Sequence, residues 1–209
     1  MSVLKQPTII TISRQYGSGG KEIAHKLGEL LGIPVYDREV ISLAAKQAGT
    51  DEYAFEQLDS GMSSPMYSIA MLDAHNSNDQ LFIAQSQVIR ELAAKGSCIF
   101  IGRCADYVLR DFDDVYNIFI TSNSLKKVEH IKKRGLFHRK TADAWLEEIA
   151  DMERRRRAYY EHYTGRIWGD ASHYHLCIDS SRTGPATAEA ILSFLSLIHI
   201  SEPTRLDVI

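Results

Sequence analysis

The chain has 209 residues, of which 44% are hydrophobic, and a formal net charge of −3. This length and composition predict one compact domain with a substantial core, and the slightly acidic charge argues against a general nucleic-acid or membrane-surface binder. Three cysteines without C-x-x-C spacing, and the lack of a long apolar run, predict a cytoplasmic protein without disulfides, signal peptide or membrane span.

The most informative segment begins at Thr8 and ends at Ala24. An apolar, β-branched run over residues 8–13 leads into a glycine-rich turn and then into a helical pattern. Gly17, Gly19 and Gly20 allow backbone conformations in which successive N–H groups surround an anion, and the helix directs its positive end to the same place. The pattern favours a nucleotide-phosphate site over a merely tight strand-to-helix turn.

The strict P-loop pattern G-x-x-x-x-G-K-[ST] does not fit this turn. With Gly19 aligned, Arg14 stands at the leading glycine, Gly20 at the lysine and Lys21 at the hydroxyl position. The predicted loop therefore keeps its shape while its charge has moved, and either Arg14 or Lys21 could supply that charge.

Apolar, β-rich runs alternate with helical patterns along the chain. The expected strands are residues 8–13, 33–36, 97–102, 115–120 and 174–179. This alternation predicts a parallel sheet covered by helices on both faces. The clusters 61–65 and 76–79 predict flexible joints, the second of them just before an apolar helical stripe over residues 81–92.

Residues 141–163 predict a helix whose apolar side is interrupted by four consecutive arginines. Arg154 and Arg157 fit a solvated basic face, but Arg156 falls within the apolar stripe. An inward-facing guanidinium needs an anion, which could be a phosphate or a carboxylate such as Glu153 or Asp151.

Charged residues follow several of the expected strands. Arg14 and Arg103 each come directly after one, and Asp37 follows another. Ligands of open parallel sheets bind beyond the carboxyl ends of the strands, so these side chains predict a site for an anionic substrate. The alternatives are that Asp37 caps the next helix and that Arg103 pairs with Asp106 or Asp111.

Four motifs together resemble the cytidylate kinase-like family of P-loop proteins. They are ISRQYGSGGKEIA, PVYDREVI, CIFIGRCADYVL and RRRRAYY followed by WGD, and the resemblance covers roughly residues 8–183. It implies a P-loop NTPase-type, three-layer α/β/α fold with a five-stranded parallel sheet. It also implies a helical acceptor-binding insertion and a lid over about residues 135–170, within one domain over residues 1–194.

The resemblance also implies the roles of individual residues. The donor phosphates would be held by Arg14, Gly17, Ser18, Gly19, Gly20 and Lys21, and the acceptor by Asp37, Arg38, Arg103 and Asp106. Arg156 and Arg103 are the expected charge-stabilising groups, with Lys21 or Arg14 at the β- and γ-phosphates. Ser13, Ser18 and Glu22 could contact Mg²⁺, but the metal site stays unassigned.

The implied activity is Mg²⁺-assisted transfer of a phosphoryl group from ATP to a nucleoside monophosphate such as CMP or dCMP. The family's usual acceptor motif, D-T-G-x-x-Y-R, is replaced here by Asp37-Arg-Glu-Val-Ile. A kinase for another small phosphorylated acceptor, a nucleotide sensor without turnover, and an RNA-binding role for the arginine run therefore remain as alternatives. Small-molecule nucleotides are the expected partners, and the oligomeric state is open.

The last residues, 195–209, resemble the in-frame translation of a transposon-end adapter used in sequencing libraries. We expect the natural chain to diverge near Phe194 and residues 195–209 to be a non-native tail, so they are left out of the fold expectations.

Overall fold

The computed structural model describes residues 7–37, 39–48, 67–134 and 141–201. Over these residues, five strands form one sheet in the order β2-β3-β1-β4-β5, and every adjacent pair is parallel. The strands are β1 (Ile9–Arg14), β2 (Val35–Tyr36), β3 (Cys98–Ile101), β4 (Val115–Thr121) and β5 (Leu176–Asp179). The predicted five-stranded parallel sheet is confirmed, with its ends displaced by one or two residues.

Side chains of β1 alternate between two apolar layers, as a strand buried on both faces requires. Ile10 and Ile12 pack under α1 (Gly20–Leu31) and α9 (Thr187–Ser201). Ile9 packs on the opposite face, against α2 (Glu39–Ala48), α4 (Tyr67–Ala93) and α5 (Ala105–Val108). The result is the predicted three-layer α/β/α arrangement.

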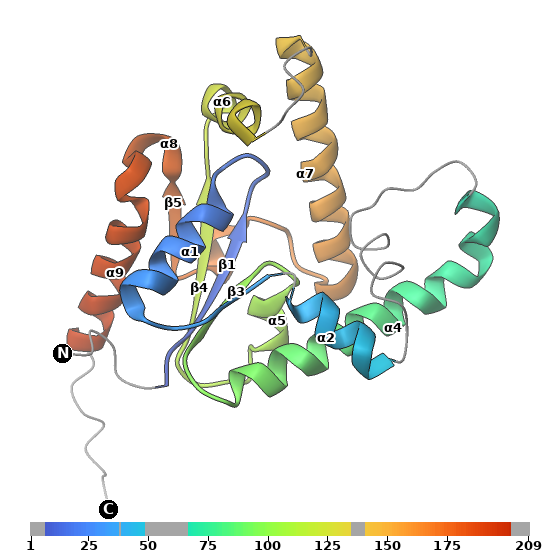
Figure 1. The fold of residues 1–209 in the computed structure, drawn as a ribbon, viewed down its shortest axis with the longest axis horizontal. Coiled ribbons are helices and arrows are strands. Elements are labelled where there is room, and N and C mark those ends of the chain that lie inside the picture. The colour runs from blue at the N-terminus through green and yellow to red at the C-terminus, as the bar shows by residue number, and fades with distance from the viewer. Residues whose placement is uncertain (1–6, 38, 49–66, 135–140, 202–209) are drawn as a thin grey trace, which may run out of the picture.

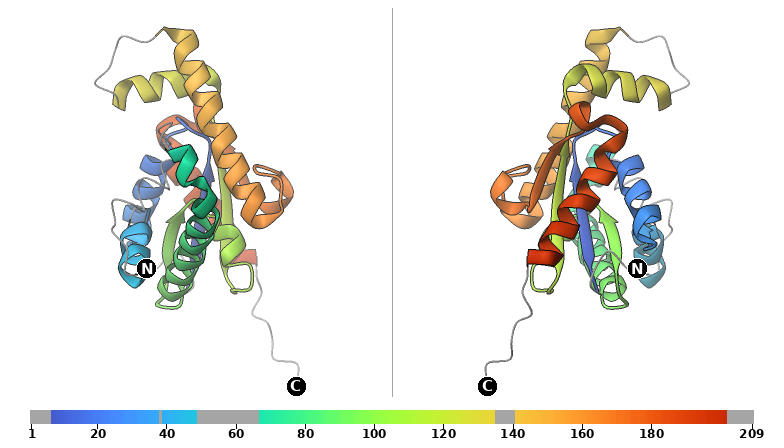
Figure 2. Two further views of the ribbon diagram at one scale, coloured as in Figure 1. Left: turned by 90° about the vertical axis from the view of Figure 1, so that its right-hand side faces the viewer. Right: turned by 90° about the vertical axis from the view of Figure 1, so that its left-hand side faces the viewer.

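Helices α6 (Ser124–Arg134) and α7 (Ala142–Thr164) extend beyond the end of the sheet at which β1 leads into α1 (Figure 1). Their apolar contact is made by Val128, Ile131, Trp145 and Ile149. The carboxyl-terminal half of α7 packs on the sheet through Tyr160, on the side of the strands opposite α1 (Figure 2). Helix α7 thus contacts α6 through its amino-terminal half and the sheet through its carboxyl-terminal half.

The chain does not break at residues 76–79, so the predicted joint there is wrong. Helix α4 is continuous from Tyr67 to Ala93. Asn and Ser disfavour a helix interior only weakly, and Asp79 accepts a hydrogen bond from the Tyr163 hydroxyl of α7 at 3.2 Å. The other predicted joint, residues 61–65, lies outside the described residues.

The carboxyl-terminal helix α9 continues to Ser201. Leu195, the first residue of the segment that resembles an adapter, is fully buried in the core beside α1. Residues of this segment therefore take part in the fold, whereas the non-native origin of residues 195–209 stays a prediction. None of the described helices combines the length and the apolar composition needed to cross a membrane.

Short elements complete the described chain near β5. They are η1 (Ala171–His173), α8 (Ser180–Thr183) and η2 (Gly184–Ala186). Helix α8 begins where β5 ends, so it lies at the same edge of the sheet as the glycine-rich turn.

Candidate functional site

The glycine-rich turn between β1 and α1 has the geometry of an anion-binding loop. Gly17 and Gly19 adopt left-handed conformations with φ of 77° and 76°, which only glycine adopts without strain. Helix α1 begins at Gly20, so its first N–H groups lack partners within the helix and point into the turn. These features match those predicted for a phosphate-binding loop.

Hydrogen bonds to the neighbouring strands hold the loop in place. The Gln15 N–H donates to the Ile120 carbonyl of β4 at 3.0 Å, and the Ser18 hydroxyl donates to the Gln15 carbonyl at 2.9 Å. The Ser180 hydroxyl lies 2.8 Å from the Ser18 carbonyl. The loop is therefore fixed from both β4 and α8 without a ligand.

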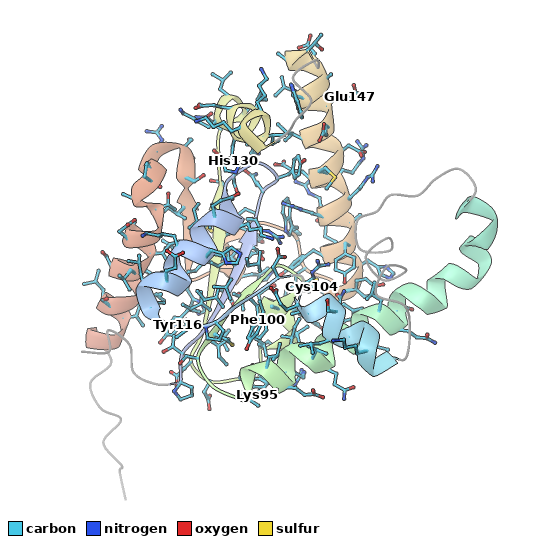
Figure 3. All side chains as sticks on the ribbon, in the orientation of Figure 1. Lys95, Phe100, Cys104, Tyr116, His130 and Glu147 are labelled. Atoms are coloured by element: carbon cyan, nitrogen blue, oxygen red, sulfur yellow. The ribbon has the colours of Figure 1, made fainter. Side chains whose placement is uncertain are left out.

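A cavity of about 500 Å³ opens on one side of the loop, towards α6 and α8. Its walls come from the loop, the first turns of α1, helix α6 and the Gly184–Pro185 turn. His130 lies between α6 and the start of α1 (Figure 3), with its Nε2 atom 3.4 Å from a Glu22 carboxylate oxygen. Its charged walls carry Glu22, Lys26, Lys126, Glu129, His130 and Lys133.

Arg14 lies on the other side of the loop, in space that two glycines leave open. A Cβ atom at Gly20 would lie 2.7 Å from the Arg14 Cβ, and one at Gly102 would lie 2.0 Å from the Arg14 Nη1. The side chain thus extends from the end of β1 across to the end of β3. Burial lowers the pKa of its guanidinium, against the opposing effect of the Asp37 charge.

Lys21, in the first turn of α1, is directed to the end of β2. Its ammonium group donates to the Asp37 carboxylate at 2.8 Å. Burial alone would raise the pKa of Asp37, but the Lys21 hydrogen bond and the charges of Arg14, Lys21 and Arg103 outweigh it and lower that pKa. Glu39 accepts a hydrogen bond from the Asp37 N–H. The Asp37 carboxylate is therefore surrounded by the positive charges of Arg14, Lys21 and Arg103.

Arg103 is held in an unfavourable backbone conformation at the end of β3. Gly102, Arg103 and Cys104 are consecutive left-handed residues, with φ of 69°, 61° and 53°. For non-glycine residues this conformation costs on the order of 1 kcal/mol each, and such strain is concentrated at functional sites. Burial and the neighbouring Arg14 charge lower the pKa of Arg103 to about 10.

Arg156 is directed inward from α7, as its position within the apolar stripe predicted, and its side chain reaches the loop. Its Nη1 donates to the Arg14 carbonyl at 3.0 Å, and its guanidinium lies 5.5 Å from the centre of the Tyr16 ring. Burial and the charge of Arg14 lower the pKa of Arg156 to about 9.

The two carboxylates that the sequence suggested as partners of Arg156 form ion pairs with other cations. Glu153 pairs with Lys127 at 2.6 Å, and Asp151 pairs with Arg154 and Arg155. Arg14, Lys21 and Arg103 act on Asp37, and Arg156 contacts the Arg14 carbonyl, so these four cations with one carboxylate carry a net positive charge. We call this group the arginine cluster.

Several neighbours of the loop carried no recognisable signal in the sequence. The Tyr16 hydroxyl donates to Glu148 of α7 at 3.2 Å, across 132 positions of the chain. Lys127 and His130 lie on the α6 surface that faces the loop. Only the fold brings these residues together, since no spacing rule links them.

Two predicted acceptor residues are not in the arginine cluster as described. Asp106 is buried in α5, where its Oδ2 accepts a hydrogen bond from the Tyr160 hydroxyl at 2.6 Å, and burial raises its pKa despite that bond. Asp106 thus lies apart from the arginine cluster, and its role as an acceptor ligand stays a prediction. Arg38 lies outside the described residues.

The proposed structural partners of Arg103 have other contacts. Asp106 is bonded to Tyr160, and Asp111 lies within ion-pair distance of Arg90 and Arg110. Both carboxylates thus contact residues other than Arg103.

No dedicated metal site is present in the described ranges. No group of three or more His, Cys, Asp or Glu side chains there is arranged to hold an ion. The Ser18 hydroxyl, one of the predicted magnesium contacts, donates to a carbonyl of the loop. These residues do not form a protein cage for Mg²⁺, an ion that often binds mainly through substrate phosphates and water.

Comparison with known proteins agrees with this description. The model of the cytidylate kinase-like family matches residues 9–182. No curated protein matches the chain. A crystal structure of an uncharacterized protein from Eubacterium ventriosum is similar, with a TM-score of 0.68 and 24% identity over 93% of this chain and 99% of that one.

Two kinases with known structures share the fold at lower identity. Gluconokinase from Sinorhizobium meliloti has a TM-score of 0.57 and 12% identity, over 93% of this chain and 94% of its own. Shikimate kinase from Bacteroides thetaiotaomicron has a TM-score of 0.53 and 10% identity, over 93% of this chain and 98% of its own. The fold is thus that of P-loop kinases.

Proposed function

Because the chain belongs to the cytidylate kinase-like family, we propose that it transfers the γ-phosphoryl group of ATP to a nucleoside monophosphate such as CMP or dCMP. The observation that carries this proposal is the position of the glycine loop. It lies between a cavity of about 500 Å³ and the arginine cluster. One side can take a nucleoside and the other can take phosphates in transfer.

The donor nucleotide fits the cavity side of the loop. A cavity of 300–1,000 Å³ is typical for small-molecule ligands, and this one is bounded by the amino end of α1. The β-phosphate would accept hydrogen bonds from the N–H groups of Gly17 to Lys21, as anions do at helix amino termini. The adenosine would extend towards His130 and the Gly184–Pro185 turn.

The arginine cluster fits the reacting phosphates. In the transfer step, an acceptor phosphate oxygen bonds to the γ-phosphorus while the bond to the β,γ-bridging oxygen breaks, and ADP leaves. Protein groups contribute to such a step chiefly by positioning the reactants and neutralising oxygen charge. Arg103 and Arg156 come from different elements and converge with Arg14, as this function requires.

Mg²⁺ would be held by the nucleotide phosphates and water, since the described residues form no cage for it. When bound, it would neutralise charge on the β- and γ-oxygens. Helices α6 and α7 extend beyond the edge of the sheet beside the loop (Figure 1). They would exclude water from the reacting phosphates.

A nucleotide sensor without turnover is the second candidate. The observation in its favour is that Arg156 donates to the Arg14 carbonyl, a backbone group, at 3.0 Å. That bond ties the guanidinium to the backbone and occupies one of its five N–H donors, which leaves fewer for a substrate. A kinase for another small phosphorylated acceptor is the third candidate, because the usual acceptor motif is missing after β2.

A panel of acceptors tests these candidates. Nucleotide-coupled turnover would be measured with ATP and Mg²⁺ against CMP, dCMP, UMP, AMP and GMP, with small sugar phosphates, shikimate and gluconate as further acceptors. We expect turnover with CMP or dCMP above the rest. Turnover only with a sugar phosphate would support the third candidate, turnover only with shikimate or gluconate would contradict all three candidates, and ATP binding without turnover on any acceptor would support the sensor.

A further inference from the structure

Compared with a strict P-loop, the glycine and the basic residue have exchanged places at positions 14 and 20 of this chain. With Gly19 aligned, the pattern requires glycine at position 14 and lysine at position 20. The two positions face each other, because a Cβ on Gly20 would lie 2.7 Å from the Cβ and 2.8 Å from the Cγ of Arg14. A long side chain fits at either position, but the backbone leaves no room for both.

Gly102 completes the space that Arg14 occupies. A Cβ there would lie 2.0 Å from Nη1 and 3.2 Å from the guanidinium carbon of Arg14. Any larger residue at Gly102 would displace the charged end of Arg14. The guanidinium is therefore positioned at the end of β3, next to Arg103 and within the electrostatic reach of Asp37.

Lys21, the other basic residue of the loop, is directed elsewhere. Its ammonium group donates a hydrogen bond to the Asp37 carboxylate at 2.8 Å. For the Arg14 guanidinium, by contrast, no carboxylate lies within ion-pair distance in the described part of the chain. A guanidinium in this position is suited to an anion from outside the protein.

We propose that Arg14 supplies the charge that a strict P-loop takes from its lysine, and that Gly20 and Gly102 are the space that this replacement requires. The inference rests on the proposed phosphoryl transfer and identifies which basic residue of the loop contacts the β- and γ-phosphates. Arginine offers a planar pair of N–H donors, so it can bind two phosphate oxygens at once, whereas lysine offers a point charge. Lys21 then acts by positioning Asp37.

Restoring the strict pattern tests the exchange. The variants are Arg14→Gly, Gly20→Lys and the double variant Arg14→Gly/Gly20→Lys, with Arg14→Met and Lys21→Met as single-charge deletions. Arg157→Met is the matched control, because Arg157 is exposed on α7. For each, ATP affinity is measured by calorimetry, turnover with the best acceptor by the coupled assay, and folding by circular dichroism and thermal unfolding.

Loss of a charge-assisted contact to phosphate predicts a fall in ATP affinity or kcat/KM on the order of 10- to 100-fold for Arg14→Met and Arg14→Gly. Gly20→Lys should be at least as defective, since the new side chain collides with Arg14. The double variant should recover at least 10-fold over Arg14→Gly, because the lysine then stands in its strict register. Arg157→Met should match the unchanged protein.

Three results would overturn the inference while the unchanged protein still binds ATP. One is Arg14→Met within threefold of the unchanged protein while Lys21→Met loses both affinity and turnover. Another is a folded double variant no better than Arg14→Gly. The third is an equal loss in Arg157→Met. If the double variant does not fold, the comparison of Arg14→Met with Lys21→Met decides. Failure of the unchanged protein to bind any nucleoside triphosphate would instead overturn the proposed function, and this inference with it.

Discussion

The two sides of the glycine loop differ in how they carry positive charge. On the cavity side, Lys26, Lys126 and Lys133 are more than half exposed, and each lies within 4.0 Å of a carboxylate. On the other side, Arg103 and Arg156 are partly buried, and burial together with the Arg14 charge lowers the pKa of both. Water screens the first group, whereas like charges face one another in the second.

This difference shows where the molecule requires an anion. Exposed ion pairs contribute little to stability, typically 0–1 kcal/mol by general experience, so the cavity side is stable with or without a ligand. Bringing guanidinium groups together out of water is unfavourable unless an anion joins them. We therefore expect the cavity side to affect ATP binding, and Arg103 and Arg156 to affect turnover.

The largest expected effect comes from Arg156→Met. Removing a charge that acts on the transferred phosphoryl group should lower kcat by about 100- to 1,000-fold, the range known for lost transition-state donors, with ATP affinity reduced far less. Arg157→Met is the matched control from the exposed face of α7. Steady-state kinetics check this split, and an unchanged kcat with a raised KM would assign Arg156 to ground-state binding.

A smaller effect is expected where α6 joins α7. Lys127→Met leaves Glu153 without its partner in a largely buried pair, which should cost about 2 kcal/mol of unfolding free energy. Lys126→Met removes the adjacent, exposed lysine and should change stability by less than about 0.5 kcal/mol. Urea unfolding measures both. Equal losses of unfolding free energy in the two variants would show that the Lys127–Glu153 pair stabilises the fold no more than an exposed ion pair does.

Asp37→Asn should remove a pH dependence of stability. Because the folded-state pKa of Asp37 is lowered, its contribution is present above the pKa of the unfolded chain and is lost as pH falls through the folded pKa. We expect Asp37→Asn to lower the unfolding free energy by about 1 kcal/mol at pH 7, as for a partly exposed charged hydrogen bond, and by progressively less below about pH 4.

The control for this measurement is Asp113→Asn, which changes an exposed carboxylate in the turn before β4. Urea unfolding between pH 7 and pH 3 compares the two variants. A difference between Asp37→Asn and the unchanged protein that stays constant over this range would contradict the lowered pKa.

The smallest effect is expected on the cavity side. His130 lies beside the loop, with its ring carbon Cε1 3.5 Å from where a Cβ on Gly19 would be. His130→Ala should raise the KM for ATP by about three- to tenfold, through the loss of a partly exposed contact, and leave kcat within twofold. A fall in kcat comparable to that of Arg156→Met would remove the distinction between the two sides.

Local patterns in the sequence predicted most of the fold. Alternation placed all five strands, and the glycines of the turn predicted its left-handed residues. The break at residues 76–79 was wrong, because the weak helix preference of Asn and Ser does not prevent a helix whose Asp79 contacts α7.

The site was less predictable, because its contacts join distant segments. Arg156 could be found from its place in the apolar stripe, but its contact with the Arg14 carbonyl spans 142 positions. Asp106 follows the same strand as Arg103, yet α5 brings its carboxylate to Tyr160. The proposal that Arg14, and not Lys21, replaces the P-loop lysine depends on the packing around Gly20 and Gly102. That packing cannot be predicted from the spacing of residues in the sequence.

The central claim is that the glycine loop binds a polyphosphate between the cavity and the arginine cluster. Its most direct test is calorimetric titration of the unchanged protein with a non-hydrolysable ATP analogue and Mg²⁺. We predict one site with a Kd in the micromolar range, and an affinity for AMP that is weaker by at least tenfold. No heat of binding at millimolar analogue, or equal affinity for AMP, would contradict the claim.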